Sequence, residues 1–314
     1  MKLHYQLPER SEAYREQRRE HPLIVAIGVF DGFHLGHRAI VREATRARRP
    51  GERTAVLTFR EHPKKFLRPG SEPPLIFTLE ERINAFARAG VDEAFVLDFD
   101  DSIATLEPRR FLDETLIDRL GARVMVVGES FHFGAKRAGD VAFARAHLAE
   151  RGLLCIGVPN TMIDGERVSS TRIRAAIAAA DFEQADRLLG DSFTLRGTVA
   201  LGFGRGHDLG FPTANLVVPL GKLIPPDGVY RITARHDGRD HPGLVSIGTN
   251  PTFDGTARTV EAWLLDFSGS LYGEDLSLRD FRFVRAQQRF ESVDALLEQM
   301  RADAATVRFP SFPK

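Results

Sequence analysis

The segment that most constrains the fold lies near the N-terminus, where a strand-like run meets a glycine-rich turn and then a helix-like pattern. The run Leu23–Ile27 is apolar and rich in β-branched residues, which predicts a buried parallel strand. Residues 28–37 form the turn, and Ala39, Ile40 and Ala44 follow it at helical spacing. A strand that leads directly into a helix places backbone N–H groups and the positive end of the helix dipole where phosphate binds. The segment therefore predicts a nucleotide-binding α/β domain.

Two histidines in this turn supply candidate chemistry. His34 and His37 are close enough in sequence to lie on one face of the first helical turn. An imidazole N–H can hydrogen-bond phosphate oxygens on which charge grows during nucleotidyl transfer, a reaction that needs positioning more than a protein nucleophile. Gly32 and Gly36 permit a tight turn and a close approach of backbone to phosphate. We therefore expect a nucleotide site here, rather than two surface histidines at the start of a packed helix.

The rest of the first half alternates between strand-like and helix-like segments. Strands are predicted at residues 54–59, 94–97, 123–128 and around Cys155. This alternation predicts a parallel sheet with helices on both faces, and the loops after the first, second and fourth strands should share one edge. Cys155 is the only cysteine, which excludes an intrachain disulfide and a thiolate metal site, and we expect it to be a small apolar filler of the core.

The pattern changes near Gly190. Short alternating strands separated by Gly/Pro turns are predicted at residues 193–195, 229–233, 244–247, 262–267 and 276–278, and a helix from about Ser292 closes the chain. Many short strands of this kind predict an antiparallel barrel or sandwich. We therefore expect two domains, residues 1–188 and 189–314.

Charge and hydropathy limit the partners and the location. Lysine plus arginine (43) balance aspartate plus glutamate (43), so no global basic field favours nucleic acid. Residues 1–22 are polar and lack a signal peptide, and no apolar run approaches the ~20 residues that span a bilayer. We expect a cytoplasmic protein that binds small molecules and neither nucleic acid nor membrane. The oligomeric state stays open.

The turn at residues 28–37 resembles the signature of nucleotidyltransferases of the adenylyltransferase superfamily, in the form found in bacterial FAD synthetases. The resemblance implies that His34 and His37 are catalytic and stabilise the pentacovalent phosphorus of ATP. It also implies that the triphosphate is held by Gly28, Phe30, Asp31, Gly32 and Gly36. The segment at residues 169–174 is similar to the second signature of the superfamily, which implies contacts with the β and γ phosphates from Ser169, Ser170, Thr171 and Arg174. Hydroxyls at a helix start and guanidinium donors suit pyrophosphate.

Two further loops resemble flavin and nucleotide loops of that family, each with one departure. Residues 58–63 are similar to Phe-x-Pro-His-Pro, with Glu61 where proline is usual. Residues 128–134 are similar to Gly-x-Asp/Asn-Phe-x-Phe-Gly, with serine in the Asp/Asn place. The resemblance implies flavin contacts from His62, Ser130, Phe131 and Phe133.

In the second half, a glycine-rich loop leads into Pro-Thr-Ala-Asn. Such a loop can cradle phosphate with its backbone N–H groups, although a flexible hairpin would look the same. Thr213 and Asn215 offer a hydroxyl and an amide oxygen two positions apart. These are hard oxygen ligands of the kind that Mg²⁺ uses together with phosphate oxygens.

This segment closely resembles the riboflavin kinase signature, which implies a six-stranded Greek-key barrel. The resemblance implies that Glu261 is the catalytic base that accepts the proton of the riboflavin hydroxyl. It also implies ATP or flavin contacts from Gly202, Gly204, Gly210, Thr213, Asn215 and Arg285. Arg285 belongs to a loop similar to Arg-x-Glu-x-x-Phe, with Gln287 in place of the usual glutamate.

Together the resemblances cover nearly the whole chain and imply a bifunctional enzyme of the bacterial FAD synthetase family. It would phosphorylate riboflavin to FMN in the second domain and adenylylate FMN to FAD in the first, with ATP and Mg²⁺ for both reactions. The substituted flavin loops leave open an enzyme of one activity whose other domain is a flavin sensor. A nucleic-acid enzyme is a further alternative, because His-x-Gly-His also resembles the class I tRNA synthetase motif. The charge balance, the lack of an anticodon-binding domain and the Pro-Thr-Ala-Asn segment argue against it.

Overall fold

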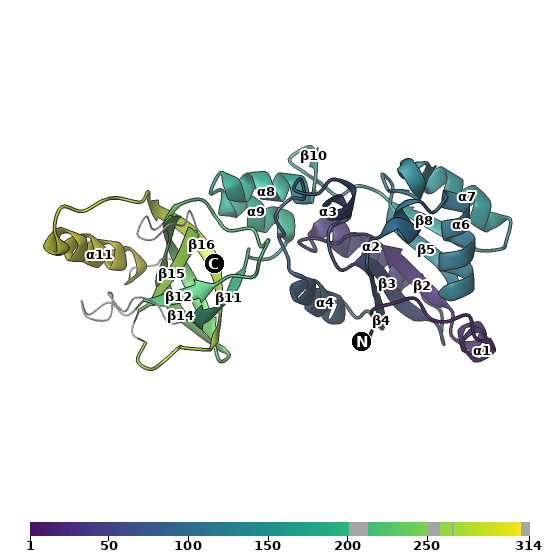
Figure 1. Ribbon diagram of the computed structural model, residues 1–314, viewed down its shortest axis with the longest axis horizontal. Coiled ribbons are helices and arrows are strands. Elements are labelled where there is room, and N and C mark those ends of the chain that lie inside the picture. The colour runs from purple at the N-terminus through teal and green to yellow at the C-terminus, as the bar shows by residue number, and fades with distance from the viewer. Residues whose placement is uncertain (201–212, 250–257, 266, 309–314) are drawn as a thin grey trace. The chain divides into compact units, whose positions relative to one another are not determined.

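The computed structural model describes residues 1–200, 213–249, 258–265 and 267–308 (Figure 1). The chain divides into two compact units, Met1–Ser170 and Thr171–Lys314. Within the described ranges, no helix has both the length and the apolar character needed to cross a membrane.

A six-stranded sheet forms the centre of the first unit, and all its strands are parallel, as predicted (Figure 1). The strand order is β1-β4-β3-β2-β5-β8. The bounds are β1 Lys2–His4, β2 Leu23–Ile27, β3 Arg53–Phe59, β4 Glu93–Leu97, β5 Ala122–Gly128 and β8 Leu154–Val158. Because β2 lies between β3 and β5, the loops that follow these three strands are neighbours at the carboxyl edge of the sheet. This adjacency confirms the predicted shared edge.

Helices cover both faces of this sheet. All of β2 is buried, and its residues alternate between two cores, as expected for a parallel strand with a helix layer on each side. On one face α2 (Leu35–Arg46) and α4 (Leu79–Arg88) contribute Val41, Ala44, Ala85 and Phe86. On the other face the π-helix η1 (Phe111–Arg119) and α7 (Val141–Ala149) contribute Phe111, Leu112, Leu116, Val141, Ala144 and Leu148.

Shorter elements complete the first unit: α1 Glu12–Glu20, α3 Pro63–Leu67, α5 Asp101–Ala104, α6 Pro108–Arg110, β6 His132–Phe133, η2 Ala135–Arg137, β7 Gly139–Asp140, β9 Met162–Ile163 and β10 Glu166–Arg167. The start of α4 is fixed by a capping box. The Thr78 hydroxyl accepts the Glu81 N–H (3.2 Å), and the Glu81 carboxylate accepts the Thr78 N–H (2.7 Å). This box sets the rotation of α4 and therefore the residues that it turns toward the sheet.

The second unit begins at Thr171, the second residue of α8 (Ser170–Ala178), includes α9 (Phe182–Leu189) and continues as a closed antiparallel barrel. The order around the barrel is β11-β12-β15-β14-β13-β16. The bounds are β11 Leu195–Ala200, β12 Ala214–Val217, β13 Gly228–His236, β14 Arg239–Thr249, β15 Arg258–Leu264 and β16 Asp275–Arg285. Strands β13 to β15 form a meander and β16 returns beside β13, which is Greek-key order. Helix α11 (Val293–Arg308) packs on the outside of the barrel through Ala304 and Val307.

A buried carboxyl group near the start of this barrel makes the stability of the fold depend on pH. Burial raises the pKa of Asp186 in α9 from 3.8 to about 6, although the Phe193 N–H (2.7 Å) and Arg282 oppose the shift. Because the folded pKa lies above the unfolded one, this carboxyl group destabilises the fold as pH rises from about 4 through about 6. Asp186→Asn keeps an acceptor for the Phe193 N–H, so we expect Tm at pH 8 to rise by about 2–4 °C. Scanning calorimetry at pH 4 and pH 8 checks this, and a Tm difference that does not grow with pH would contradict it.

Candidate active sites

The histidine turn, defined as residues 28–37, joins β2 to α2 at the carboxyl edge of the sheet. His34 is the N-cap of α2, and its Nδ1 accepts the backbone N–H of His37 (3.3 Å). The two imidazole rings stack with their centroids 3.6 Å apart and an interplanar angle of 16°. Because Nδ1 of His34 is an acceptor, the proton of its neutral ring is on Nε2. The turn therefore offers an N–H donor at the positive end of a helix dipole.

His37 is partly exposed as a residue, but its ring is turned into the protein so that Nδ1 is buried. Burial lowers the pKa of His37 well below 6.5, and the neighbouring His34 and Arg82 lower it further. The ring meets the edge of Phe30 at 5.3 Å. Among the described residues, the buried Nδ1 of His37 has no hydrogen-bond partner. A buried polar atom of this kind calls for a partner, and a bound nucleotide phosphate would provide one.

The backbone of the turn is strained at two aromatic residues. Phe30 has a φ of 55° and Phe33 a φ of 38°. Both values lie in the left-handed region, which residues other than glycine rarely adopt. Such strain persists only where surrounding contacts determine the conformation, and it is common at functional sites. Gly32 also has a positive φ (83°), and a side chain there would come within 3.1 Å of Ile76. The glycine is thus required by packing as well as by the turn.

Gly36 leaves room for the His34 ring. A Cβ at this position would lie 3.2–3.3 Å from Cε1 and Nδ1 of His34. Gly36→Ala should therefore displace the His34 ring by a few tenths of an ångström while favouring the helix. We expect about a tenfold slower formation of FAD from FMN with no loss of Tm. A rate equal to that of the unsubstituted protein would show that the ring tolerates the methyl group.

The second predicted phosphate segment is divided between the two units. The Ser170 hydroxyl donates to the backbone carbonyl of Asp31 (2.9 Å), so this serine lies against the histidine turn. Ser169 precedes it. Thr171 and Arg174 lie in α8 and belong to the second unit, so their approach to the triphosphate stays a prediction.

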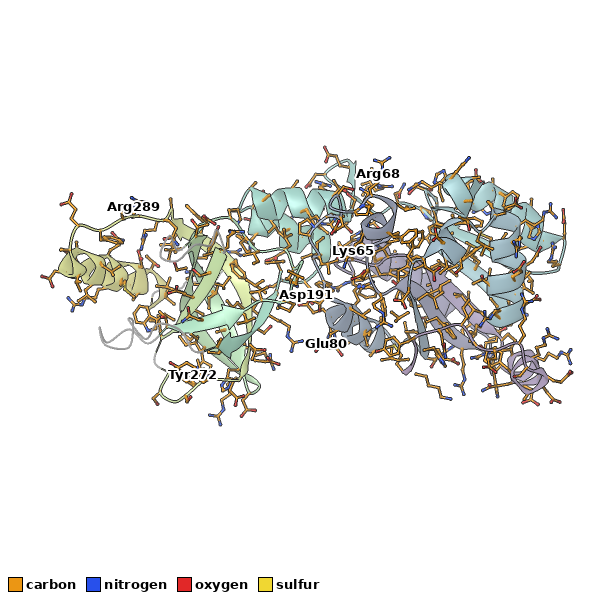
Figure 2. All side chains as sticks on the ribbon, in the orientation of Figure 1. Lys65, Arg68, Glu80, Asp191, Tyr272 and Arg289 are labelled. Atoms are coloured by element: carbon orange, nitrogen blue, oxygen red, sulfur yellow. The ribbon has the colours of Figure 1, made fainter. Side chains whose placement is uncertain are left out.

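The predicted loop after β3 begins α3. His62 is the N-cap of that helix, and its Nδ1 accepts the Lys64 N–H (3.1 Å). Glu61, which occupies the usual proline position, pairs with Lys65 one helical turn later. Lys65 is labelled in Figure 2. The substitution is thus accommodated by an exposed ion pair. It leaves the His62 ring at the start of the helix.

The predicted loop after β5 also has internal contacts. The Ser130 hydroxyl accepts from the Arg167 guanidinium (2.8 Å). Phe131 and Phe133 stack at 5.8 Å, and Phe133 is buried beside Phe111 and Phe143. Phe133 therefore contributes to the core, whereas Phe131 is partly exposed, and a flavin contact from either residue stays a prediction.

Arg82 belongs to this site but was not among the residues predicted from the sequence. Its side chain is on the buried face of α4 and is 1% exposed. Nη1 donates to the carbonyls of Val29 (3.0 Å) and Phe59 (2.9 Å), and Nη2 donates to the carbonyl of Arg60 (2.8 Å). The sequence signal was an arginine four positions before Phe86, on the apolar stripe of an amphipathic helix.

In the second unit, barrel register places three polar side chains in a row. Asn215 of β12 pairs with Glu261 of β15, which pairs in turn with Ser246 of β14. All three are partly exposed while their sequence neighbours are buried, so they lie on the outer face of the barrel. Thr213 immediately precedes β12. The predicted loop glycines Gly202, Gly204 and Gly210 lie outside the described residues.

Gln287 extends this row. Its Nε2 donates to the Ser246 hydroxyl (2.8 Å) and to the Ile247 carbonyl (3.0 Å). Arg285, a predicted ligand contact, is held by Asp303 of α11 at 2.8 Å. This buried ion pair fastens the helix to the barrel and fixes the start of the loop that carries Gln287. A direct contact between Arg285 and a nucleotide or flavin stays a prediction.

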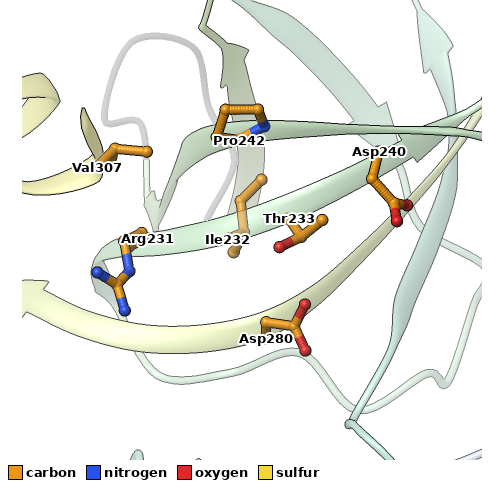
Figure 3. Close-up of a pocket in the computed structure, with 7 residues that line it drawn as sticks. All are labelled: Arg231, Ile232, Thr233, Asp240, Pro242, Asp280 and Val307. Carbon is orange, nitrogen blue, oxygen red and sulfur yellow. The ribbon is translucent and has the colours of Figure 1, made fainter. Parts of the chain in front are cut away.

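A separate cavity of about 140 Å³ lies on another part of the outer barrel face (Figure 3). It contains none of the predicted kinase residues and is lined by Arg231, Ile232, Thr233, Asp240, Pro242, Asp280 and Val307. Its carboxylates are already engaged. Asp240 accepts from Arg279 (2.6 Å), and Asp280 accepts from Ser192 (2.8 Å).

Comparisons with known proteins match the N-terminal and the C-terminal half of the chain to two known families. Residues 16–172 match the family model for FAD synthetase, and residues 189–309 match the family model for riboflavin kinase. The bifunctional riboflavin kinase/FMN adenylyltransferase of Pseudomonas fluorescens is 38% identical over 94% of this chain and 96% of its own length. The enzyme of the same description from Escherichia coli K12 is 33% identical over 91% of each chain.

A solved structure of a protein called a macrolide-efflux protein from Streptococcus pneumoniae is also similar. Its TM-score is 0.84 at 33% identity, and the match covers 93% of this chain and 95% of that one. This likeness supports the fold. The two family models together match most of the chain, and relatives of both activities match it over more than nine-tenths of its length, so the chain belongs to the bifunctional riboflavin kinase/FMN adenylyltransferase family.

Proposed function

We propose that the two activities of this family are divided between residues 1–188 and 189–314, and that each has its own set of catalytic residues. The first domain transfers AMP from ATP to FMN, and the second transfers the γ-phosphate of ATP to riboflavin. The kinase family model begins at residue 189, which supports this boundary. We further propose that the enzyme acts in the cytoplasm on small molecules alone.

The stacked His34–His37 pair carries the assignment of adenylyl transfer. An FMN phosphate oxygen attacks the α-phosphorus of ATP, the bond from that phosphorus to the bridging oxygen breaks, and pyrophosphate leaves. Negative charge shifts onto the phosphate oxygens, where the imidazole donors and the N-terminus of α2 stabilise it. In this proposal Ser169, Ser170, Thr171 and Arg174 hold the leaving pyrophosphate.

The FMN acceptor lies at the carboxyl edge of the same sheet. The loops after β3 and β5 flank the histidine turn, because their strands are the neighbours of β2. We assign flavin contacts to His62, Ser130, Phe131 and Phe133, with Phe131 as the exposed aromatic surface. Phe66 of α3 is 40% exposed and lies four positions after His62, so it is a further aromatic candidate.

The cross-strand neighbours Asn215 and Glu261 carry the assignment of kinase activity. Glu261 accepts the proton of the riboflavin 5′-hydroxyl as its oxygen attacks the γ-phosphorus, and ADP leaves. The partly exposed hydroxyl of Thr213 and amide of Asn215 fit a Mg²⁺ ion that takes its other ligands from ATP. When bound, the ion neutralises phosphate charge. Gly202, Gly204 and Gly210 would cradle the phosphates.

Two separate assays test the division. Riboflavin with ATP and Mg²⁺ should yield FMN and ADP, and FMN with ATP and Mg²⁺ should yield FAD and pyrophosphate, both followed by chromatography. Excess EDTA should stop both reactions. Accumulation of FMN without FAD would overturn the adenylyl-transfer half and favour an enzyme with a single activity.

A further inference from the structure

A buried guanidinium joins the histidine turn to the loop that follows β3. Arg82 reaches across from α4 and donates to the carbonyl of Val29 in the turn. The same group donates to the carbonyls of Phe59 and Arg60, which lead to His62. One side chain from a third element therefore fixes the backbone on both sides of the proposed reaction centre.

These bonds act where the turn is strained. The Val29 carbonyl accepts two donors, Nη1 of Arg82 (3.0 Å) and the Thr58 hydroxyl (3.1 Å), and these two groups lie 3.2 Å apart. The next residue, Phe30, has the unfavourable φ of 55°. Holding the carbonyl in this direction maintains that conformation, which is unfavourable on its own. The rings that follow are positioned by the same backbone.

The segment just before α4 holds the other side of the turn. The Asp31 carboxylate accepts the N–H groups of Ile76 (3.3 Å) and Phe77 (2.8 Å). The capping box then starts α4 at the next residue, Thr78. Asp31, which the sequence assigns to ATP, is thus bonded to protein backbone, and it also faces the charge of Arg82. Helix α4 and its entry form a clamp on the histidine turn.

Arg82 also contributes charge. The titratable and charged groups that act on His37 are His34 and Arg82, and Asp31 acts on Arg82. Burial lowers the pKa of His37 most, and the neighbouring His34 and the positive charge of Arg82 lower it further, so that ring stays neutral at neutral pH. A neutral ring and a protonated ring differ in the number of donors that they present to phosphate.

We propose that Arg82 is a positioning residue for adenylyl transfer, which sets the geometry of the histidine turn and of the His62 loop through the carbonyls of Val29, Phe59 and Arg60. The proposal rests on the assignment of FAD formation to this turn. Arg82 itself touches neither ATP nor FMN in it.

Three variants separate this role from general stabilisation. Arg82→Met removes the donors and the charge, whereas Arg82→Lys keeps the charge but cannot span three carbonyls. Arg119→Met is the matched control. Arg119 also donates to two backbone carbonyls, those of Pro8 (2.8 Å) and Leu7 (2.9 Å), but it precedes β5 at the opposite edge of the sheet. Each variant is assayed as full-length protein, at a temperature below its own Tm, from pH 5 to pH 8.

Arg82→Met should lower kcat for FAD formation about 100-fold and raise KM for FMN. Because the charge beside His37 is lost, the pKa of that ring should rise, and the acidic limb of the pH profile should move to higher pH. In Arg82→Lys the acidic limb of the pH profile should stay where it is in the unsubstituted protein, and kcat should fall about tenfold. In Arg119→Met, kcat for FAD formation and the acidic limb of its pH profile should both stay unchanged. FMN formation serves as the internal control in every variant.

If kcat and the acidic limb are as unchanged in Arg82→Met as in Arg119→Met, the proposal about Arg82 is overturned. The proposed function still stands in that case. If Arg82→Met does not fold, Arg82→Lys decides, and an unchanged kcat in that variant overturns the proposal. Failure of the unsubstituted protein to form FAD from FMN would overturn the proposed function together with this inference.

Discussion

We expect His37→Ala to lower the rate of FAD formation from FMN to near the limit of detection and to leave FMN formation from riboflavin intact. The substitution removes an imidazole that stacks on His34 at 3.6 Å and has a buried nitrogen near the N-terminus of α2. Loss of one preorganised donor to a developing oxyanion costs about 10²–10³-fold in rate. His34 also loses its stacking partner, so we expect the upper end of this range. Chromatographic assay of each half-reaction measures the effect.

His21→Ala is the control for this prediction. His21 lies just before β2, at the amino edge of the sheet, where its ring contacts the Gly51 carbonyl. Both activities should survive that change. Loss of FMN formation in a folded His37→Ala protein would show that the two sites are not independent.

Glu261→Ala and Asn215→Ala give the opposite result: FMN formation is lost, and supplied FMN is still converted to FAD. Removal of the proposed base should lower the kinase rate about 10²–10⁴-fold. Glu261→Gln keeps the shape of the side chain, so an equal loss in that variant assigns the effect to proton transfer. Removal of the Asn215 amide should raise the Mg²⁺ concentration needed for half-maximal rate.

Glu274→Gln changes an exposed carboxylate in the turn before β16 and serves as the matched control. It should leave the kinase unaffected. A Glu261→Gln protein with normal kinase kcat would assign the base elsewhere, and loss of FAD formation in either Glu261 variant would contradict separate sites.

Features that depend on nearby residues could be predicted from the sequence. The run Leu23–Ile27 and the helix that follows the turn are local patterns, and the structure confirms them. The exposed edge strand β1 was missed because its three residues leave no periodic signal, and it is defined by pairing with β4 far along the chain. The nine-residue π-helix η1 reads in sequence as an ordinary amphipathic helix.

Side-chain geometry could not be predicted where it depends on contacts between distant segments. The bond from Arg82 to the Val29 carbonyl joins residues 53 apart in sequence. Gly36 was attributed to phosphate approach, but the nearest side-chain atoms belong to His34. The row from Asn215 to Ser246 depends on the register of three barrel strands. A shift of one residue in that register would turn a side chain of the row inward.

We propose that the two active sites of this chain act independently of each other. A mixture of the His37→Ala and Glu261→Ala proteins tests this directly, with riboflavin, ATP and Mg²⁺ as the only substrates. The first variant should supply FMN and the second should convert it, so FAD should accumulate in the mixture although neither protein forms it alone from riboflavin. A mixture that accumulates FMN without FAD would contradict the account.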